Sequence, residues 1–199
     1  MTLPEGYTDI PHGKIAAIVT LLEMTQPAFP RPEPRTTAVS IRHITLPKLE
    51  WYRDLYRCIG EEWLWFSRLK LNNDDLASII RNPAVELYAV ETEGSDTGLL
   101  ELDFRVAGEC ELAFFGLIAS SRGKGLGRWL MNRAIERAWS RPIRRFWVHT
   151  CNLDHPDALL FYIRTGFRAF RRQLEIADDP RVVGLLPRTA APQVPLITA

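Results

Sequence analysis

Arg122-Gly123-Lys124-Gly125-Leu126-Gly127-Arg128 lies between an apolar run, 112–119, and a helical pattern, 129–139. The three glycines within five residues allow a tight turn and a close approach of the backbone to a ligand. The helix that follows presents its unpaired N–H groups and the positive end of its dipole to this loop. A strand, a basic glycine-rich loop and a helix in this order predict a site for a pyrophosphate or a similar anion. A purely structural strand-to-helix turn is the alternative.

The composition limits the class of protein. The 199 residues fit one domain of ordinary size, and 46% apolar with 25% charged residues is typical of a soluble globular protein. A net charge of +1 gives no overall electrostatic reason to expect nucleic acid or an anionic membrane as a partner. No apolar run approaches the ~20 residues that span a bilayer. The three cysteines, Cys58, Cys110 and Cys151, have no paired or metal-like spacing, so we expect a reduced, cytoplasmic setting.

The hydrophobic pattern predicts the element order β-βαα-ββ-βα-βα-β. Strands are expected at 15–24, 38–44, 85–91, 99–106, 110–119, 146–151 and 167–176, and helices at 46–59, 72–80, 129–139 and 156–165. Antiparallel strands followed by a βαβ crossover give a mixed α/β sheet with helices on its faces.

Four prolines within 27–34 separate the first strand from the rest of the chain. We therefore expect an N-terminal strand and proline-rich segment at 1–37, the main domain at 38–177 and a tail at 178–199. The extra first strand is expected to cover either a sheet edge or a partner subunit.

Two motifs at compatible spacing add a more specific indication. In the first, a basic residue is followed by Gly three positions on and a second Gly two positions later, between a strand and a helix. In the second, an Asn ends the next strand and the following helix carries a Tyr and ends in Gly-Phe. The residues are Arg122, Gly125 and Gly127, then Asn152, Tyr162, Gly166 and Phe167. Over roughly 39–176 the chain resembles the GCN5-related N-acetyltransferase (GNAT) family.

The resemblance implies a fold and a binding site for acetyl-CoA. Strands 111–119 and 146–151 would run parallel and splay apart, and the pantetheine arm would enter between them. Its partners would be backbone groups of Leu117, Ile118 and Ala119 and the amide of Asn152. The pyrophosphate would meet Arg122, Gly123, Lys124, Gly125, Leu126, Gly127 and Arg128. As an alternative, Asn152 is a polar strand end.

Catalytic roles follow from the chemistry of amide formation. Tyr162 is the candidate general acid for the leaving thiolate, because a phenol with a pKa near ~10 stays protonated at neutral pH. Glu111 is the first candidate for the base and Glu109 the second, and a water relay without a dedicated base is the alternative. Tyr162 as a packed aromatic, and Glu111 as a surface carboxylate, are the structural alternatives.

Residues near these groups could contact the acceptor. Glu62, Trp63 and Trp65, together with Glu61 and Phe66, fall where the family builds its acceptor wall, and carboxylates beside aromatics suit a cationic amine. An aromatic helix face that completes the core is an equally good reading.

Histidine and cysteine side chains lie near the Asn152 turn. His155 is a candidate base or substrate contact, whereas His149 is more typical of a packed strand residue. Cys151 is expected to be a small buried hydrophobe rather than a nucleophile. The spacing of the nearby histidines and aspartates does not predict a metal site.

The sequence thus predicts an acetyl-CoA-dependent N-acetyltransferase that acts on a primary amine by direct attack, without a metal. A small-molecule acceptor is favoured over a protein terminus, and a homodimer is possible. The alternative is a module that binds acyl-CoA without turnover.

Overall fold

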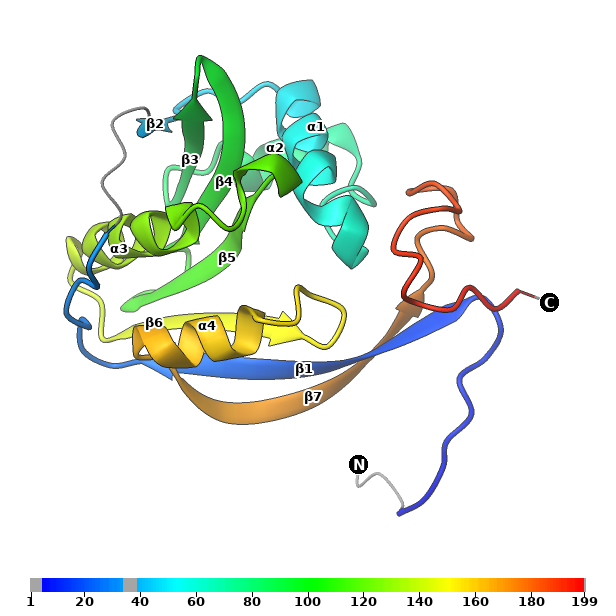
Figure 1. The fold of residues 1–199 in the computed structure, drawn as a ribbon. Coiled ribbons are helices and arrows are strands. Elements are labelled where there is room, and N and C mark those ends of the chain that lie inside the picture. The colour runs from blue at the N-terminus through cyan, green and yellow to red at the C-terminus, as the bar shows by residue number, and fades with distance from the viewer. Residues whose placement is uncertain (1–4, 34–38, 199) are drawn as a thin grey trace.

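The computed structural model describes residues 5–33 and 39–198, and these form one seven-stranded mixed sheet with four α-helices (Figure 1). The strands are β1 Lys14–Met24, β2 Val39–His43, β3 Val85–Thr92, β4 Ser95–Asp103, β5 Glu109–Leu117, β6 Arg145–Cys151 and β7 Arg168–Asp178. The α-helices are α1 Leu49–Gly60, α2 Asn73–Ile80, α3 Leu126–Trp139 and α4 Ala158–Thr165. The expected element order is confirmed, although the first residue expected in the second strand, Ala38, lies outside the described residues.

Helices cover both faces of this sheet. Buried residues of α3 and α4 form one hydrophobic cluster with one face, around Leu130, Phe146 and Tyr162. Buried residues of α1 and α2 form a second cluster on the opposite face, which also contains Leu186 and Ala190 of the tail. Among the described residues, no helix is long and apolar enough to cross a membrane.

Local sequence signals explain where the helices begin and end. Helix α1 begins at Leu49 and not at Leu46 as expected. Leu46 precedes Pro47, and the proline ring disfavours the helical conformation of the residue before it. The Asn72 side chain caps α2 by accepting a hydrogen bond of 2.8 Å from the backbone N–H of Asp75. Gly166 ends α4 with a left-handed φ of 111°, which glycine adopts without strain.

Strand β1 lies inside the sheet, so the expectation that it covers an edge is wrong. The strand order is β2-β3-β4-β5-β6-β1-β7, and β1 pairs antiparallel with β6 on one side and with β7 on the other (Figure 1). Residues 14–24 therefore complete the same sheet as the main domain. Only β2 and β7 are edge strands among those described.

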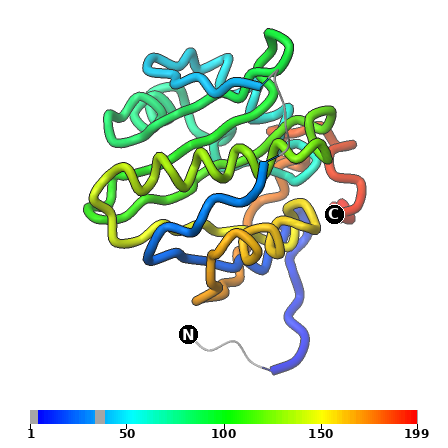
Figure 2. Tube along the Cα trace, turned by 60° about the vertical axis from the view of Figure 1, so that its left-hand side comes forward, coloured from blue at the N-terminus to red at the C-terminus, as the bar shows by residue number. Residues whose placement is uncertain are grey.

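The described part of the proline-rich segment, up to residue 33, lies along helix α3 (Figure 2). The amide of Asn132 accepts a hydrogen bond from the Arg31 N–H and donates one to the Arg31 carbonyl, and Arg128 donates one to the carbonyl of Pro32. Glu33 forms an ion pair with Arg133, with 3.1 Å between the charged atoms. The segment is thus a linker held in place by polar contacts with α3.

Strand β4 is buried on both faces, although its sequence alternates apolar and charged residues. Glu101 is fully buried and accepts hydrogen bonds from the Tyr52 hydroxyl and the Arg68 guanidinium. Because burial and the neighbouring carboxylate both disfavour a phenolate, the pKa of Tyr52 lies well above its usual value. The charge of Glu101 is compensated inside the protein by the guanidinium of Arg68.

Candidate active site

Strands β5 and β6 separate after a short parallel pairing. Their paired residues run only from Glu109 opposite Arg145 to Glu111 opposite Trp147, whereas β5 continues to Leu117 and β6 to Cys151. Beyond this point the two strands no longer pair, which leaves a V-shaped opening in the middle of the sheet. The splayed arrangement expected from the sequence is present.

A cleft of about 530 Å³ occupies this opening and extends beneath α1. It is lined by most of the side chains expected to carry the chemistry, namely Glu111, Tyr162, Trp63, Trp65 and His155, and by four of the expected cofactor contacts, Leu117, Arg122, Gly123 and Gly127. Glu62, Lys124, Gly125, Leu126, Arg128, Ile118, Ala119 and Asn152 do not line it.

The glycine-rich loop has the geometry of an anion site. Gly123 and Gly125 have left-handed φ angles of 75° and 79°, and no described atom lies within 4 Å of a Cβ placed on Gly123. Among the described residues, no backbone carbonyl accepts a hydrogen bond from the N–H groups of 123–127. These donors lie at the N-terminus of the 14-residue helix α3, where a phosphate group would find free N–H groups and the positive dipole end.

Three of the expected pantetheine contacts, Ile118, Ala119 and Asn152, already make hydrogen bonds within the protein. The Ala119 carbonyl accepts one from the Arg122 N–H at 3.2 Å. The Ile118 N–H donates to the Thr97 carbonyl at 2.9 Å, and the Ile118 carbonyl accepts from Ser121. Asn152 is exposed, and its side-chain oxygen accepts a 2.6 Å hydrogen bond from the backbone N–H of Ile18. In this structure Asn152 therefore joins β6 to β1, and its role in binding pantetheine stays a prediction.

Glu111 lies beside His149 on the α1 side of the opening. The Oε1 atom of Glu111 is 3.4 Å from Nδ1 of His149, and both residues line the cleft. This carboxylate raises the pKa of His149, more than burial lowers it. The expected base thus has an imidazole partner that can share its proton. Glu109, the second candidate, forms an ion pair with Arg145 instead.

Tyr162 lies on the opposite side of the cleft, on α4. Only 8% of its surface is exposed, and it packs among the rings of Phe115, Phe161 and Phe167. Burial raises the pKa of Tyr162, and the charge of Asp154 adds to this effect. The hydroxyl therefore stays protonated at neutral pH and can donate a hydrogen bond.

Cys151 also lines the cleft, at the end of β6. Burial, with a further contribution from Asp154, raises the pKa of its thiol to about 11. Since the nucleophilic form of cysteine is the thiolate, Cys151 is almost entirely in its unreactive form at neutral pH.

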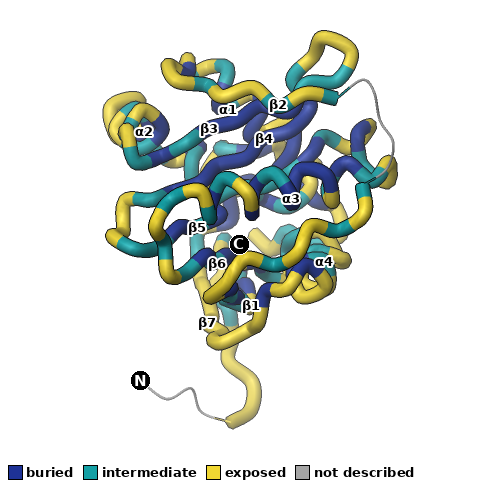
Figure 3. The backbone as a smooth tube through the Cα atoms, turned by 90° about the vertical axis from the view of Figure 1, so that its left-hand side faces the viewer, coloured by how far each residue is buried: buried dark blue, intermediate teal, exposed yellow. Residues whose placement is uncertain are grey.

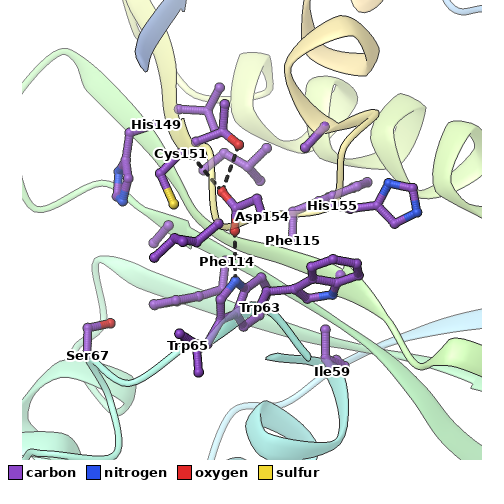
Figure 4. Close-up of a pocket in the computed structure, with 18 of the residues that line it drawn as sticks. Ile59, Trp63, Trp65, Ser67, Phe114, Phe115, His149, Cys151, Asp154 and His155 are labelled. Carbon is purple, nitrogen blue, oxygen red and sulfur yellow. Dashed lines mark hydrogen bonds between the residues drawn. The ribbon is translucent and has the colours of Figure 1, made fainter. Parts of the chain in front are cut away.

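Asp154 lies at the centre of the cleft (Figure 4). Its Oδ1 atom accepts a 3.1 Å hydrogen bond from the indole N–H of Trp65, and its Oδ2 atom accepts from the Thr150 hydroxyl and the Cys151 N–H. The carboxylate thereby connects the β6–α4 loop to the segment after α1. Trp65 also approaches Gly116, where an added Cβ would be 3.1 Å from its ring.

Arg122 connects the glycine-rich loop to the predicted acceptor wall. Its guanidinium forms an ion pair with Glu62 and lies 5.4 Å from the ring centre of Trp63. The ring of Trp63 in turn lies 5.2 Å from that of His155, on the β6–α4 loop. The expected cofactor loop, acceptor wall and β6–α4 loop thus meet at one point.

Sequence reasoning missed the roles of His149 and Asp154 in the cleft. His149 alternates with Val148 and Thr150 along β6, so its side chain points to the same face as Glu111 once the two strands are known to be parallel neighbours. This alternation is visible in the sequence, but it indicates a shared face with Glu111 only when the pairing of β5 with β6 is known. For Asp154, no sequence pattern indicated the contact with Trp65, which lies 89 residues away.

Comparisons with known proteins agree with this geometry. The family model described as "Acetyltransferase (GNAT) family" matches residues 48–167. A GCN5-related N-acetyltransferase from Sphaerobacter thermophilus superposes with a TM-score of 0.58 at 17% identity, covering 82% of this chain and 52% of that one. A GNAT family acetyltransferase from Elizabethkingia anophelis, with acetyl-CoA bound, gives 0.53 at 17% identity over 68% and 80% of the chains.

A third solved structure is an aminoglycoside N-acetyltransferase in complex with CoA, with a TM-score of 0.50, 20% identity and coverage of 69% and 93%. The chain spans only 52% to 63% of the length of three of the solved structures that it resembles. A search of curated proteins gives no match. Because the family model spans more than half of the sequence and the fold agrees, the chain belongs to the GNAT family of acetyltransferases.

Proposed function

We propose that the protein is an N-acetyltransferase that moves the acetyl group of acetyl-CoA to the primary amine of a small molecule. One observation carries the proposal: the opening between β5 and β6 has an acid–base pair, Glu111 and His149, on one side and a buried phenol, Tyr162, on the other. Amide formation from a thioester needs a proton acceptor for the amine and a proton donor for the thiolate.

The glycine-rich loop supports binding of the CoA pyrophosphate. Free N–H groups at 123–127 and the guanidinium of Arg122 supply donors and positive charge at one end of the cleft. The open edge of β5 after Glu111 leaves backbone groups available to an extended pantetheine chain. Acetyl-CoA supplies the activated acyl group, and the protein orients the two reactants and protonates the departing sulfur.

Proton transfers can be assigned to this chain's own residues. Neutral His149 takes the proton of the ammonium form of the acceptor, and Glu111 stabilises the imidazolium that results. The free amine nitrogen then attacks the thioester carbonyl and a C–N bond forms. As the C–S bond breaks, the positively charged nitrogen loses a second proton, which replaces the one that Tyr162 gives to the sulfur, and the imidazolium of His149 returns its own proton to solvent. Tyr162 donates a proton to the departing sulfur. The high pKa of Cys151 supports this direct route over transfer through a cysteine.

The lining of the cleft favours a cationic, partly apolar acceptor. Aromatic rings of Trp63, Trp65 and Phe114 lie in the same cleft as the carboxylates of Asp154 and Asp157. Aromatic faces and carboxylates attract ammonium groups and exclude anions. We therefore expect hydrophobic amines to be better acceptors than amino sugars or acidic amines.

Calorimetric titration with acetyl-CoA, with CoA and ATP as controls, tests the cleft. Binding of acetyl-CoA and CoA but not of ATP is expected, and thiol release can then be followed across a panel of aryl-alkyl amines, polyamines and amino sugars. Absence of CoA binding would overturn the proposal. Tight binding without transfer to any amine would replace it with the acyl-CoA-binding module.

A further inference from the structure

Strand β7 is an unusually exposed edge strand. It ends the sheet and, among the described residues, pairs only with β1. Ten of its 11 residues are exposed, as the tube coloured by burial shows (Figure 3). One side of β7 therefore presents a row of unpaired N–H and C=O groups, which is a template for pairing with another strand.

The charges along β7 are divided between its two halves. The first half carries Arg168, Arg171 and Arg172, and the second half carries Glu175 and Asp178. Asp178 forms an ion pair with Lys14, whereas within the described ranges Glu175 and the three arginines have no ion-pair partner. The charges of β7 are therefore complementary to those of a second β7 strand that runs in the opposite direction.

A two-fold axis at Gln173 would make use of this complementarity. Antiparallel pairing of two β7 strands about that residue places Arg171 of each copy directly opposite Glu175 of the other, and Arg172 opposite Leu174. The basic half of one strand then faces the acidic half of its partner at both ends. Parallel pairing in register would instead place equal charges side by side.

Exposed apolar side chains lie next to the same edge. Leu174 is 36% exposed and Ile176 49%, and the neighbouring strand adds Ile18, 48% exposed and directly opposite Leu174. In the antiparallel pair, the two Leu174 side chains become diagonal neighbours on one face, within reach of each other. Pairing would therefore cover apolar surface as well as satisfy backbone groups.

We propose that the chain forms a two-fold homodimer by antiparallel pairing of β7 with β7 of a second copy. The two sheets become one continuous sheet. Glu175 lines the cleft, and it lies on the same face of β7 as Arg171. The dimer thus brings Arg171 of the second copy to the rim of each cleft, so that the charge of Glu175 is balanced there.

Charge exchange tests this register. Sedimentation equilibrium of the full chain should give about twice the 22.8 kDa chain mass. Arg171→Glu and Glu175→Arg should each shift the population to monomer, because each creates two like-charged pairs. The double variant Arg171→Glu/Glu175→Arg should regain the dimer, because both pairs are again opposite in charge. Arg57→Glu, an exposed change on α1, is the matched control and should leave the mass unchanged.

A cross-link gives an independent readout. Two copies of Gln173→Cys would face each other at the axis, at the Cα separation of directly paired strands, which a disulfide can span. Mild oxidation should produce a covalent dimer in this variant but not in the native chain, whose exposed Cys58 is the control thiol. A native chain that stays monomeric at all concentrations, or a dimer indifferent to every substitution in β7, would overturn the proposal.

Discussion

The Nδ1 atom of His149 lies 3.4 Å from Oε1 of Glu111, at the point where β5 and β6 begin to separate. The carboxylate stabilises the imidazolium and so raises the pKa of His149. Because the imidazole accepts a proton only in its neutral form, the activity limb that rises with pH should lie above the usual value of about 6.5.

Glu111→Gln should move this limb to lower pH, since the neutral amide no longer favours the imidazolium. The plateau rate should fall at least about tenfold, because His149 becomes a weaker base. A pH profile of kcat for the native enzyme, Glu111→Gln and His149→Gln separates the roles. If His149→Gln retains the native limb, the imidazole is not the group that titrates.

Tyr162→Phe should lower kcat roughly a hundredfold, within the usual range for a lost general acid, while the affinity for acetyl-CoA stays nearly unchanged. The ring and its contacts with Phe161 and Phe167 remain, so the fold should be preserved. Steady-state kinetics measure kcat, and calorimetry measures the affinity for acetyl-CoA. Phe161→Leu at the same helix is a useful packing control, and equal kcat values for Tyr162→Phe and the native enzyme would refute the proton-donor role.

Gly127→Trp should abolish binding of acetyl-CoA by filling the pyrophosphate end of the cleft. Gly127 is a better probe than Gly125, whose φ of 79° would strain any other residue. A Cβ at Gly127 would meet only a ring atom of Phe161 at 4.0 Å, so Gly127→Ala should fold and bind normally. Calorimetry of both variants, with a thermal melt of each, distinguishes a blocked site from a damaged fold. Native affinity in Gly127→Trp would place the pyrophosphate elsewhere.

Glu62→Gln should tighten acetyl-CoA binding by about two- to fivefold. The ion pair with Glu62 holds Arg122 toward the acceptor wall, and a partly exposed pair contributes up to ~1 kcal/mol. Without that pair, Arg122 is free to contact a phosphate. Arg122→Ala should weaken binding, and the combination of both changes should behave like Arg122→Ala alone. Weaker binding in Glu62→Gln would show that Glu62 positions Arg122 instead of competing for it.

Local patterns predicted the elements well, because they depend on neighbouring residues. The Asn72 cap and the Gly166 helix end were readable for this reason. The position of β1 in the sheet could not be predicted from the sequence, since an isolated apolar strand carries no information about which strands it will join. The interior position of β1 also explains a contact of Asn152 that the sequence did not indicate: its amide oxygen accepts a hydrogen bond from the Ile18 N–H of β1, while its role toward a ligand stays a prediction.

The candidate site shows the same difference between local signals and long-range contacts. Tyr162 and the glycine-rich loop stand in motifs with fixed spacing, Glu111 stands at the start of a recognisable strand, and all three contribute to one cleft. By contrast, the contacts of Asp154 with Trp65 and of Arg122 with Glu62 join segments 89 and 60 residues apart. Such pairs depend on the tertiary arrangement of α1 against the sheet, and no periodicity in the sequence encodes them.

The interior position of β1 has a consequence for how the chain is made. Synthesis produces residues 14–24 well before their partners β6 and β7, and Lys14 pairs with Asp178, 164 residues later. An apolar strand must therefore wait unpaired until β6 and β7 have left the ribosome. Closing so long a loop late slows folding, and nascent chains of this protein should depend on chaperones until their last strand emerges.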